Sequence, residues 1–137
     1  AFQSPLQGLE NVILSPHIGG STLEAQANIG REVAASLRAY LVEGRTASSV
    51  TLPEVELSRP RATSTRLLNI HRNVPGVLSS INSRIANGGA NVVAQALATQ
   101  EEVGVLLLEL DAGGESVTQL AAEIAALSTS LRTRVLS

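Results

Sequence analysis

Residues 71–76 carry side chains that could recognise a small zwitterion, at the point where a strand is expected to end and a helix to begin. A helix N-terminus offers unpaired N–H groups and partial positive charge, which suit a ligand carboxylate. Gly76 lets a ligand approach the backbone. His71 and Asn73 could hydrogen-bond the ligand, and Asn91, which opens the next strand after Gly88-Gly89-Ala90, adds an amide expected near the same rim. These positions predict a binding site for a small ligand with a carboxylate, such as a zwitterion.

Each of these residues also has a purely structural interpretation. Asn73 could cap the helix, and His71 could be a surface histidine whose hydrogen bonds are satisfied. Taken one at a time, the structural interpretations are better. The combination of His71, Asn73 and Pro75-Gly76 at this spacing favours ligand binding.

A second segment with chemical potential contains His17, Ile18, Gly19 and Gly20. A histidine acts as a general acid or base only when substrate lies within hydrogen-bond reach. The alternative is that His17 lies at the start of a helix and has no catalytic role. No G-x-G-x-x-G follows a predicted strand, so nothing here builds the phosphate loop of a dinucleotide-binding fold. We therefore expect the 137-residue chain to be catalytically inactive by itself.

The composition limits the other possibilities. The formal net charge is −2, the ten basic residues are all arginine, and cysteine is absent. A nearly balanced charge does not indicate a binding surface for nucleic acid. We expect Arg132 and Arg134 to lie on a solvated strand face. Two His and one Asp leave little with which to bind a metal. No apolar run is long enough for a membrane span and no signal peptide opens the chain, so we expect a soluble, cytoplasmic protein without metal.

The first part of the chain contains few elements. Apolar runs predict short strands at 11–14 and 49–52, and the capping-box pattern of residues 21–24 predicts a helix that Gly44 ends. Two strands and one helix cannot enclose a core. Residues 58–64 are polar, contain Pro60 and read as a linker.

The second part has the pattern of a complete small domain. Strands are expected at 65–72, 91–99, 103–110 and 131–136, with helices after Pro75-Gly76 and after Gly113-Gly114. The order is βαββαβ, which predicts an α+β, ferredoxin-like fold with both helices on one face of a four-stranded sheet. The other face also carries apolar residues, which favours a covering partner and self-association.

Residues 71–78 resemble the signature of ACT domains, small regulatory modules that bind amino acids. Residues 12–22 resemble the closing segment of the cofactor domain of D-2-hydroxyacid dehydrogenases, and residues 24–30 and 49–55 resemble the branch that oxidises 3-phosphoglycerate, in the first step of L-serine synthesis. That branch also carries an ACT domain.

The resemblance implies that the chain is the C-terminal part of such an enzyme, with NAD as the parent's cofactor. Residues 1–20 would end an incomplete Rossmann-type α/β domain, 21–57 would return to the substrate domain, and 65–137 would be the regulatory domain. His17 would be the parent's acid–base residue, with residues 17–20 against the nicotinamide. His71, Asn73 and Asn91 would bind L-serine, a feedback inhibitor, at the interface of a homo-oligomer. The alternatives are a stand-alone amino-acid-binding module and a ligand-free dimerisation domain.

Overall fold

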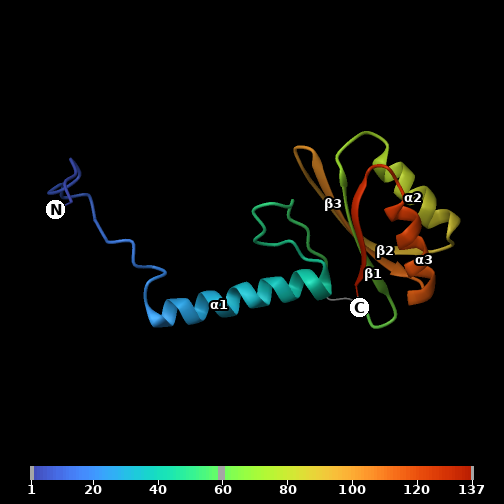
Figure 1. Cartoon of the computed structure of the whole chain (residues 1–137), viewed down its shortest axis with the longest axis horizontal. Coiled ribbons are helices and arrows are strands. Elements are labelled where there is room, and N and C mark those ends of the chain that lie inside the picture. Colours follow the sequence, from blue (N-terminus) through green and yellow to red (C-terminus); the bar gives the residue numbers. More distant parts are fainter. Residues whose placement is uncertain (1, 59–60, 137) are drawn as a thin grey trace. The chain divides into compact units, whose positions relative to one another are not determined.

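The computed structural model describes residues 2–58 and 61–136, which divide into two compact units. One unit ends at Val33 and the other begins at Ala34. The second unit contains the sheet and the two helices of the predicted βαββαβ domain (Figure 1).

In the first unit, residues 2–22 form turns and irregular chain. Helix α1, Leu23–Arg38, begins in this unit and ends in the second. Thr22 is the residue that caps this helix, because its Oγ1 accepts a hydrogen bond from the Ala25 N–H at 3.0 Å. The strand predicted at 11–14 is wrong: these residues adopt no strand in the described chain. A four-residue apolar run needs a neighbouring strand for its backbone groups, and the described part of this unit contains none.

The second unit is built on a four-stranded antiparallel sheet of order β2-β3-β1-β4. The strands are β1, Thr65–Arg72; β2, Asn91–Gln100; β3, Val103–Asp111; and β4, Ser130–Leu136. The helices are α2, Val77–Asn87, and α3, Gly114–Ala125. The α+β, ferredoxin-like prediction is thereby confirmed, with each predicted strand correct to within one residue at each end.

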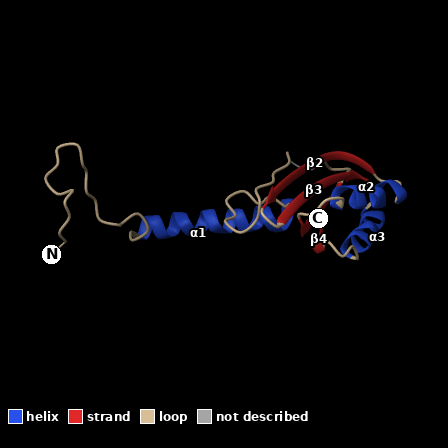
Figure 2. Cartoon of the chain, turned by 90° about the horizontal axis from the view of Figure 1, so that it is seen from above, coloured by secondary structure: helices blue, strands red, loops and turns tan. Residues whose placement is uncertain are grey.

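Both helices lie on one face of the sheet (Figure 2). Their apolar stripes and the inward-facing strand residues make one core, formed by Leu67, Val77, Ile81, Ile85, Leu106, Leu108, Leu110, Val117, Leu120, Ala121 and Ile124. The stripes predicted from 3.6-residue spacing are therefore the buried ones.

The opposite face of the sheet is covered in part by residues 40–57 of the same chain. Tyr40, Leu52, Val55 and Leu57 pack with strand residues in a second apolar cluster that includes Leu68, Val105, Leu107 and Leu136. Covering of this face was expected from a partner, but the chain itself supplies part of it. Residues from the 40–57 segment are thus part of the core of the second unit. Their own few elements could not have formed a core by themselves.

The chain enters this covering segment through a tight turn. Helix α1 continues into a short π-helix, η1, Ala39–Glu43, which ends at Gly44 as predicted. Gly44 has φ 74° and lies against the Leu136 and Leu107 side chains, so a methyl group at Cα would overlap both. The left-handed backbone favours glycine, and the Leu107 and Leu136 side chains would have to shift to admit a Cβ.

Residues 46–55 form a loop, and the strand predicted at 49–52 is wrong. Thr46 closes the loop: its Oγ1 donates to the Pro53 carbonyl at 2.7 Å and accepts from the Val55 N–H at 2.8 Å. Ser49 Oγ accepts a hydrogen bond from the Leu52 N–H. Side chains of this segment therefore satisfy backbone groups that a strand would have paired with a neighbour.

Part of the predicted linker 58–64 is fixed to the sheet by a buried carboxylate; its positions 59 and 60 lie outside the described residues. Glu109 of β3 pairs with Arg66 of β1 at 3.0 Å, and their side chains are 5% and 2% exposed. The Arg61 N–H and the Ser64 hydroxyl donate to the same carboxylate at 3.0 and 2.6 Å. The guanidinium of Arg66 also donates to the carbonyls of Glu43 and Ser58. We call Arg61, Ser64, Arg66 and Glu109 the Glu109 cluster.

Arg134 of β4 is not the freely solvated side chain that was expected. Its guanidinium lies 5.3 Å from the centre of the Tyr40 ring and donates to the Leu41 carbonyl at 3.1 Å. A cation over an aromatic face gives a modest electrostatic attraction. This contact adds to the attachment of η1 to the sheet.

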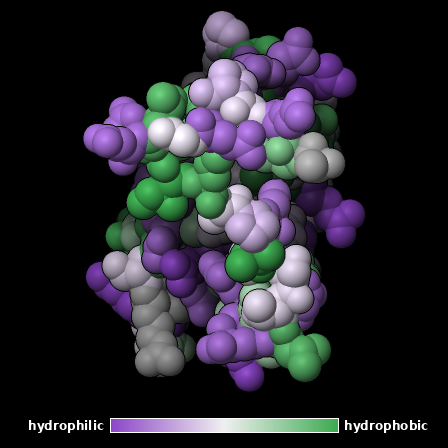
Figure 3. All heavy atoms as spheres, turned by 90° about the vertical axis from the view of Figure 1, so that its left-hand side faces the viewer, coloured by the Kyte–Doolittle hydropathy of each residue, from purple (hydrophilic) through white to green (hydrophobic). Residues whose placement is uncertain are grey.

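Several apolar side chains of the first 41 residues remain exposed, among them Phe2, Ile13, Leu23, Leu37 and Leu41. Figure 3 shows separate patches of apolar side chains among polar ones on the face that it presents. Within the described residues, no helix is both long enough and apolar enough to cross a lipid bilayer.

Candidate functional site

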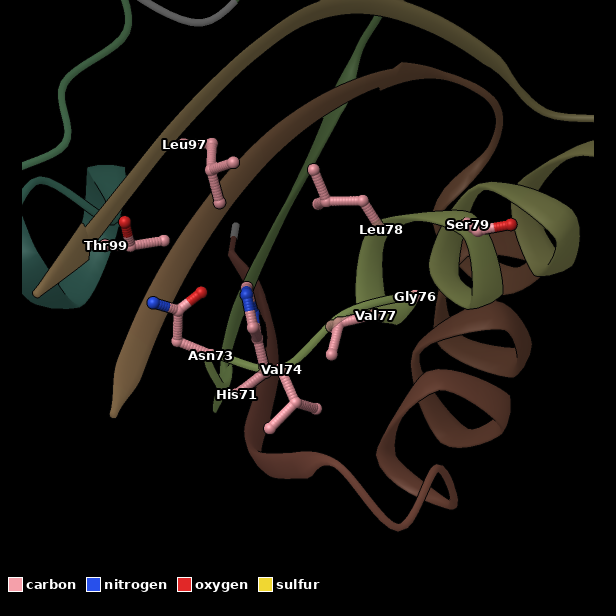
Figure 4. Close-up of a pocket in the computed structure, with 9 residues that line it drawn as sticks. All are labelled: His71, Asn73, Val74, Gly76, Val77, Leu78, Ser79, Leu97 and Thr99. Atoms are coloured by element: carbon pink, nitrogen blue, oxygen red, sulfur yellow. The ribbon is translucent and has the colours of Figure 1, made fainter. Parts of the chain in front are cut away.

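A pocket of about 280 Å³ lies where β1 ends and α2 begins. Its lining comes from the β1–α2 connection, the first turn of α2 and the end of β2: His71, Asn73, Val74, Gly76, Val77, Leu78, Ser79, Leu97 and Thr99 (Figure 4). Pockets for drug-sized ligands usually begin near this volume, so the space suits a small molecule. Two predicted site residues, His71 and Asn73, meet here.

His71 lines the bottom of the pocket, and its neighbours hold the side chain in one position. The residue is 3% exposed, and its Nδ1 lies 3.0 Å from the Asn69 Oδ1. The imidazole lies over Gly104 of β3, where any Cβ would overlap the ring. Burial lowers the pKa of His71 below its usual value of 6.5, because desolvation disfavours the charged form. The ring is therefore held neutral near pH 7.

Asn73 is fixed by the turn between β2 and β3. Its backbone N–H donates to the Glu102 carbonyl at 2.8 Å, and its Nδ2 donates to the Glu101 carbonyl at 3.0 Å. The amide oxygen lies on the side of His71 (Figure 4). The N-cap of α2 is Gly76, without a side-chain capping bond, so the alternative that Asn73 caps this helix is wrong.

The remaining wall of the pocket comes from α2 and β2. Gly76 has φ 87°, and a methyl group there would meet open space, so the backbone at the helix start is accessible. Leu97 and Thr99 line the pocket from β2. The sequence analysis did not predict either residue as part of the site. The strand register would have placed Thr99 near His71, because Thr99 pairs with Gly104 and Gly104 pairs with His71.

Asn91 does not share a rim with His71 in one chain. Asn91 pairs with Asp111 at the start of β2, whereas the pocket lies at the other end of that strand beside Thr99. Eight residues of strand at about 3.3 Å each separate the two positions by roughly 25 Å. The expected proximity within the chain is therefore wrong, because it ignored the direction of β2.

Residues 17–20 lie in the other compact unit, in a bend and turn before α1. His17, Ile18 and Gly19 are exposed. In the described part of the chain, the structure gives His17 no side-chain hydrogen bond or ion pair, and no group of three or more His, Cys, Asp or Glu could hold a metal ion.

The pocket combines polar groups with apolar walls: a neutral imidazole, a carboxamide, a hydroxyl and an open helix N-terminus. Such groups have the donors and acceptors that a small polar ligand requires. They do not make a nucleophile with an adjacent base, the arrangement that covalent catalysis requires.

The family comparison agrees with this architecture. Residues 67–132 match the family described as "AHAS small subunit-like ACT domain". The βαββαβ order, the antiparallel sheet and both helices on one face agree with the ferredoxin-like fold of an ACT domain.

Over nearly its whole length, the chain is a relative of D-3-phosphoglycerate dehydrogenase. It is 42% identical to the Escherichia coli (strain K12) protein of that name over 135 residues, 98% of this chain and 32% of the relative. The protein of the same name from Dictyostelium discoideum is 42% identical over 136 residues, again 98% of this chain and 32% of the relative. The chain thus spans about a third of the length of these relatives.

Solved structures show a looser likeness. The ACT domain from GTP pyrophosphokinase of Chlorobium tepidum has a TM-score of 0.49 and 12% identity, and the match covers 53% of this chain and 96% of that chain.

Proposed function

We propose that this chain is the regulatory part of an NAD-dependent D-3-phosphoglycerate dehydrogenase and that its ACT domain binds L-serine. The observation that carries the proposal is the pocket in which His71, Asn73 and the start of α2 converge. A family match to an ACT domain and relatives named D-3-phosphoglycerate dehydrogenase support it.

The pocket offers a partner for each group of a small amino acid. The N–H groups and partial positive charge at the start of α2 suit the carboxylate. The Asn73 amide oxygen and the His71 imidazole can accept hydrogen bonds from an ammonium or hydroxyl group. The pocket volume of about 280 Å³ is sufficient for a small amino acid.

A second copy of the chain would bring Asn91 to this pocket. β2 is a ten-residue strand at the edge of the sheet, so its outer backbone N–H and C=O groups pair with no other strand of that sheet. Antiparallel pairing of two β2 strands about a two-fold axis near Gln95 would set the partner copy's residue 91 beside Thr99, because 95 lies midway between the two. The site would then lie across the interface of a dimer.

The parent reaction would transfer a hydride from the substrate carbon to NAD while His17 takes the hydroxyl proton. Residues 1–20 would belong to the cofactor domain and 21–57 to the substrate domain of that enzyme. Serine would inhibit if it binds one arrangement of the domains better than another.

Isothermal titration of the chain with L-serine tests the proposal. We expect serine-dependent heat, with binding weakened about tenfold or more in Asn73→Ala and in Asn91→Ala, since each substitution removes a hydrogen-bonding amide. Gln119→Ala, on the exposed side of α3, is the control and should bind like the parent chain. Sedimentation should show dimers.

The outcomes separate the candidate functions. Heat with other amino acids but not with serine would favour a stand-alone module of different specificity. A dimer without heat from any amino acid would favour the ligand-free dimerisation domain, for which the exposed edge of β2 is the supporting observation.

A further inference from the structure

A buried polar side chain next to His71 has no part in the binding site as described so far. Asn69 lies two residues before His71 on β1, on the same face of the strand, and is fully buried. Its Nδ2 lies 2.8 Å from the Ser130 Oγ and 2.9 Å from the Thr133 Oγ1 of β4. The Asn69 side chain thus bridges His71 and β4.

The orientation of the Asn69 amide follows from its neighbours. The Arg132 carbonyl lies 3.4 Å from Nδ2, and a carbonyl oxygen accepts hydrogen bonds but cannot donate them. The Ser130 and Thr133 hydroxyls can serve either orientation of the amide, since a hydroxyl both donates and accepts. Turning the amide over would set its oxygen against the Arg132 carbonyl, so this carbonyl is the neighbour that favours the present orientation. The NH2 group therefore faces β4, and Oδ1 faces the His71 Nδ1 at 3.0 Å.

This orientation determines the proton on the imidazole. Since Oδ1 is an acceptor only, the His71 Nδ1 must be the donor of that hydrogen bond. In the neutral ring one nitrogen carries the proton and the other has a free lone pair. The Nε2 atom, which lies over Gly104 next to the pocket, is then an acceptor.

We propose that Asn69 is a positioning residue of the effector site, which fixes His71 as the Nδ1–H tautomer so that Nε2 accepts a hydrogen bond from the bound ligand. A ligand must then present a hydroxyl or an ammonium group to this nitrogen, and a carboxylate oxygen is repelled there. The ligand's identity rests on the proposed function, whereas the tautomer and its cause do not.

The tautomer is directly measurable by ¹⁵N NMR of the imidazole nitrogens, because protonated and unprotonated ring nitrogens have well-separated chemical shifts. His17→Gln leaves His71 as the only histidine in the sequence. In that background we expect Nδ1 to carry the proton and Nε2 to be bare at pH 7.5. A ring protonated at Nε2 would overturn the proposal without reference to any further variant.

Asn69→Leu should release the ring, shifting it towards the Nε2–H form that predominates in free histidine. Ser130→Ala is the matched control that keeps Oδ1 in place, since Thr133 and Arg132 still hold the amide, and it should leave the tautomer unchanged. An amide spectrum with native dispersion shows whether each variant is folded. A folded Asn69→Leu chain that retains Nδ1–H would overturn the role of Asn69.

Titration with L-serine separates this proposal from the proposed function. We expect Asn69→Leu to weaken serine binding about tenfold, as the loss of one hydrogen bond would, although Asn69 does not line the pocket. Unchanged binding would overturn the positioning role in recognition. An Nδ1–H ring in a chain that binds no serine would support the placement of the proton by Asn69 and contradict the proposed ligand.

Discussion

Neutralising the buried carboxylate of Glu109 should strongly destabilise the second unit. In Glu109→Gln the side chain keeps its shape, but the Arg66 guanidinium, 2% exposed, loses its counter-charge at 3.0 Å. Removing one partner of a buried ion pair costs about 3–5 kcal/mol, because the remaining charge stays desolvated. A loss of 3 kcal/mol in a domain of this size lowers Tm by at least about 12 °C.

The assay is urea unfolding followed by far-UV circular dichroism, since the chain contains no tryptophan. Glu123→Gln is the control, because the Arg84–Glu123 pair is 4.0 Å apart with side chains 47% and 40% exposed. Exposed pairs contribute about 0–1 kcal/mol. The double variant Arg66→Met/Glu109→Leu should lose less than Glu109→Gln, because it leaves no buried charge without a partner.

The effect should also depend on pH with a definite sign. The hydrogen bond from Ser64, with those from Arg61 and Arg66 and the Arg66 charge, lowers the pKa of Glu109 despite its desolvation. A carboxyl with a lowered folded-state pKa stabilises fully above its unfolded value of about 4.3, and this contribution disappears as the pH falls through the folded value. Equal losses in Glu109→Gln and Glu123→Gln at pH 7 would refute the reasoning.

Two further predictions concern Gly44 and His71. Gly44→Ala should lower the unfolding free energy by about 1–3 kcal/mol, from the left-handed backbone and the overlap with Leu107 and Leu136. Gly114→Ala, at a helix start with no atom within 4 Å of its added methyl group, should leave stability unchanged or raise it; similar losses in both variants in urea unfolding would contradict this. His71 should titrate below pH 6.5 by NMR, because burial lowers its pKa. Its contribution to stability is then greatest above pH 6.5 and decreases as the pH falls through the folded-state value, and a measured pKa at or above 6.5 would be the opposite result.

The βαββαβ domain was predictable because its signals are local. Alternation marked β1, one glycine pair marked the end of α2 and another the start of α3, and 3.6-residue spacing marked the faces that both helices bury. The candidate site was predictable as far as His71 and Asn73, because the strand–helix connection holds both residues within a few positions of each other.

The missed features depend on contacts between distant residues. Runs 11–14 and 49–52 have the length of strands, but pairing depends on a neighbour that the run itself does not specify. The packing of residues 40–57 on the sheet, and the place of Asn91 at the far end of β2, follow from topology. The Glu109 cluster had a signal: Arg66 and Glu109 face each other in the β1–β3 register, which becomes visible only once the register is known.

Gly104 has an evolutionary consequence. The imidazole of His71 occupies the space that any larger residue at position 104 would fill. The two positions should therefore covary: homologues with alanine or valine at 104 should carry a smaller side chain than histidine at 71. A mutation at 104 would then abolish the proposed effector binding without contacting the ligand.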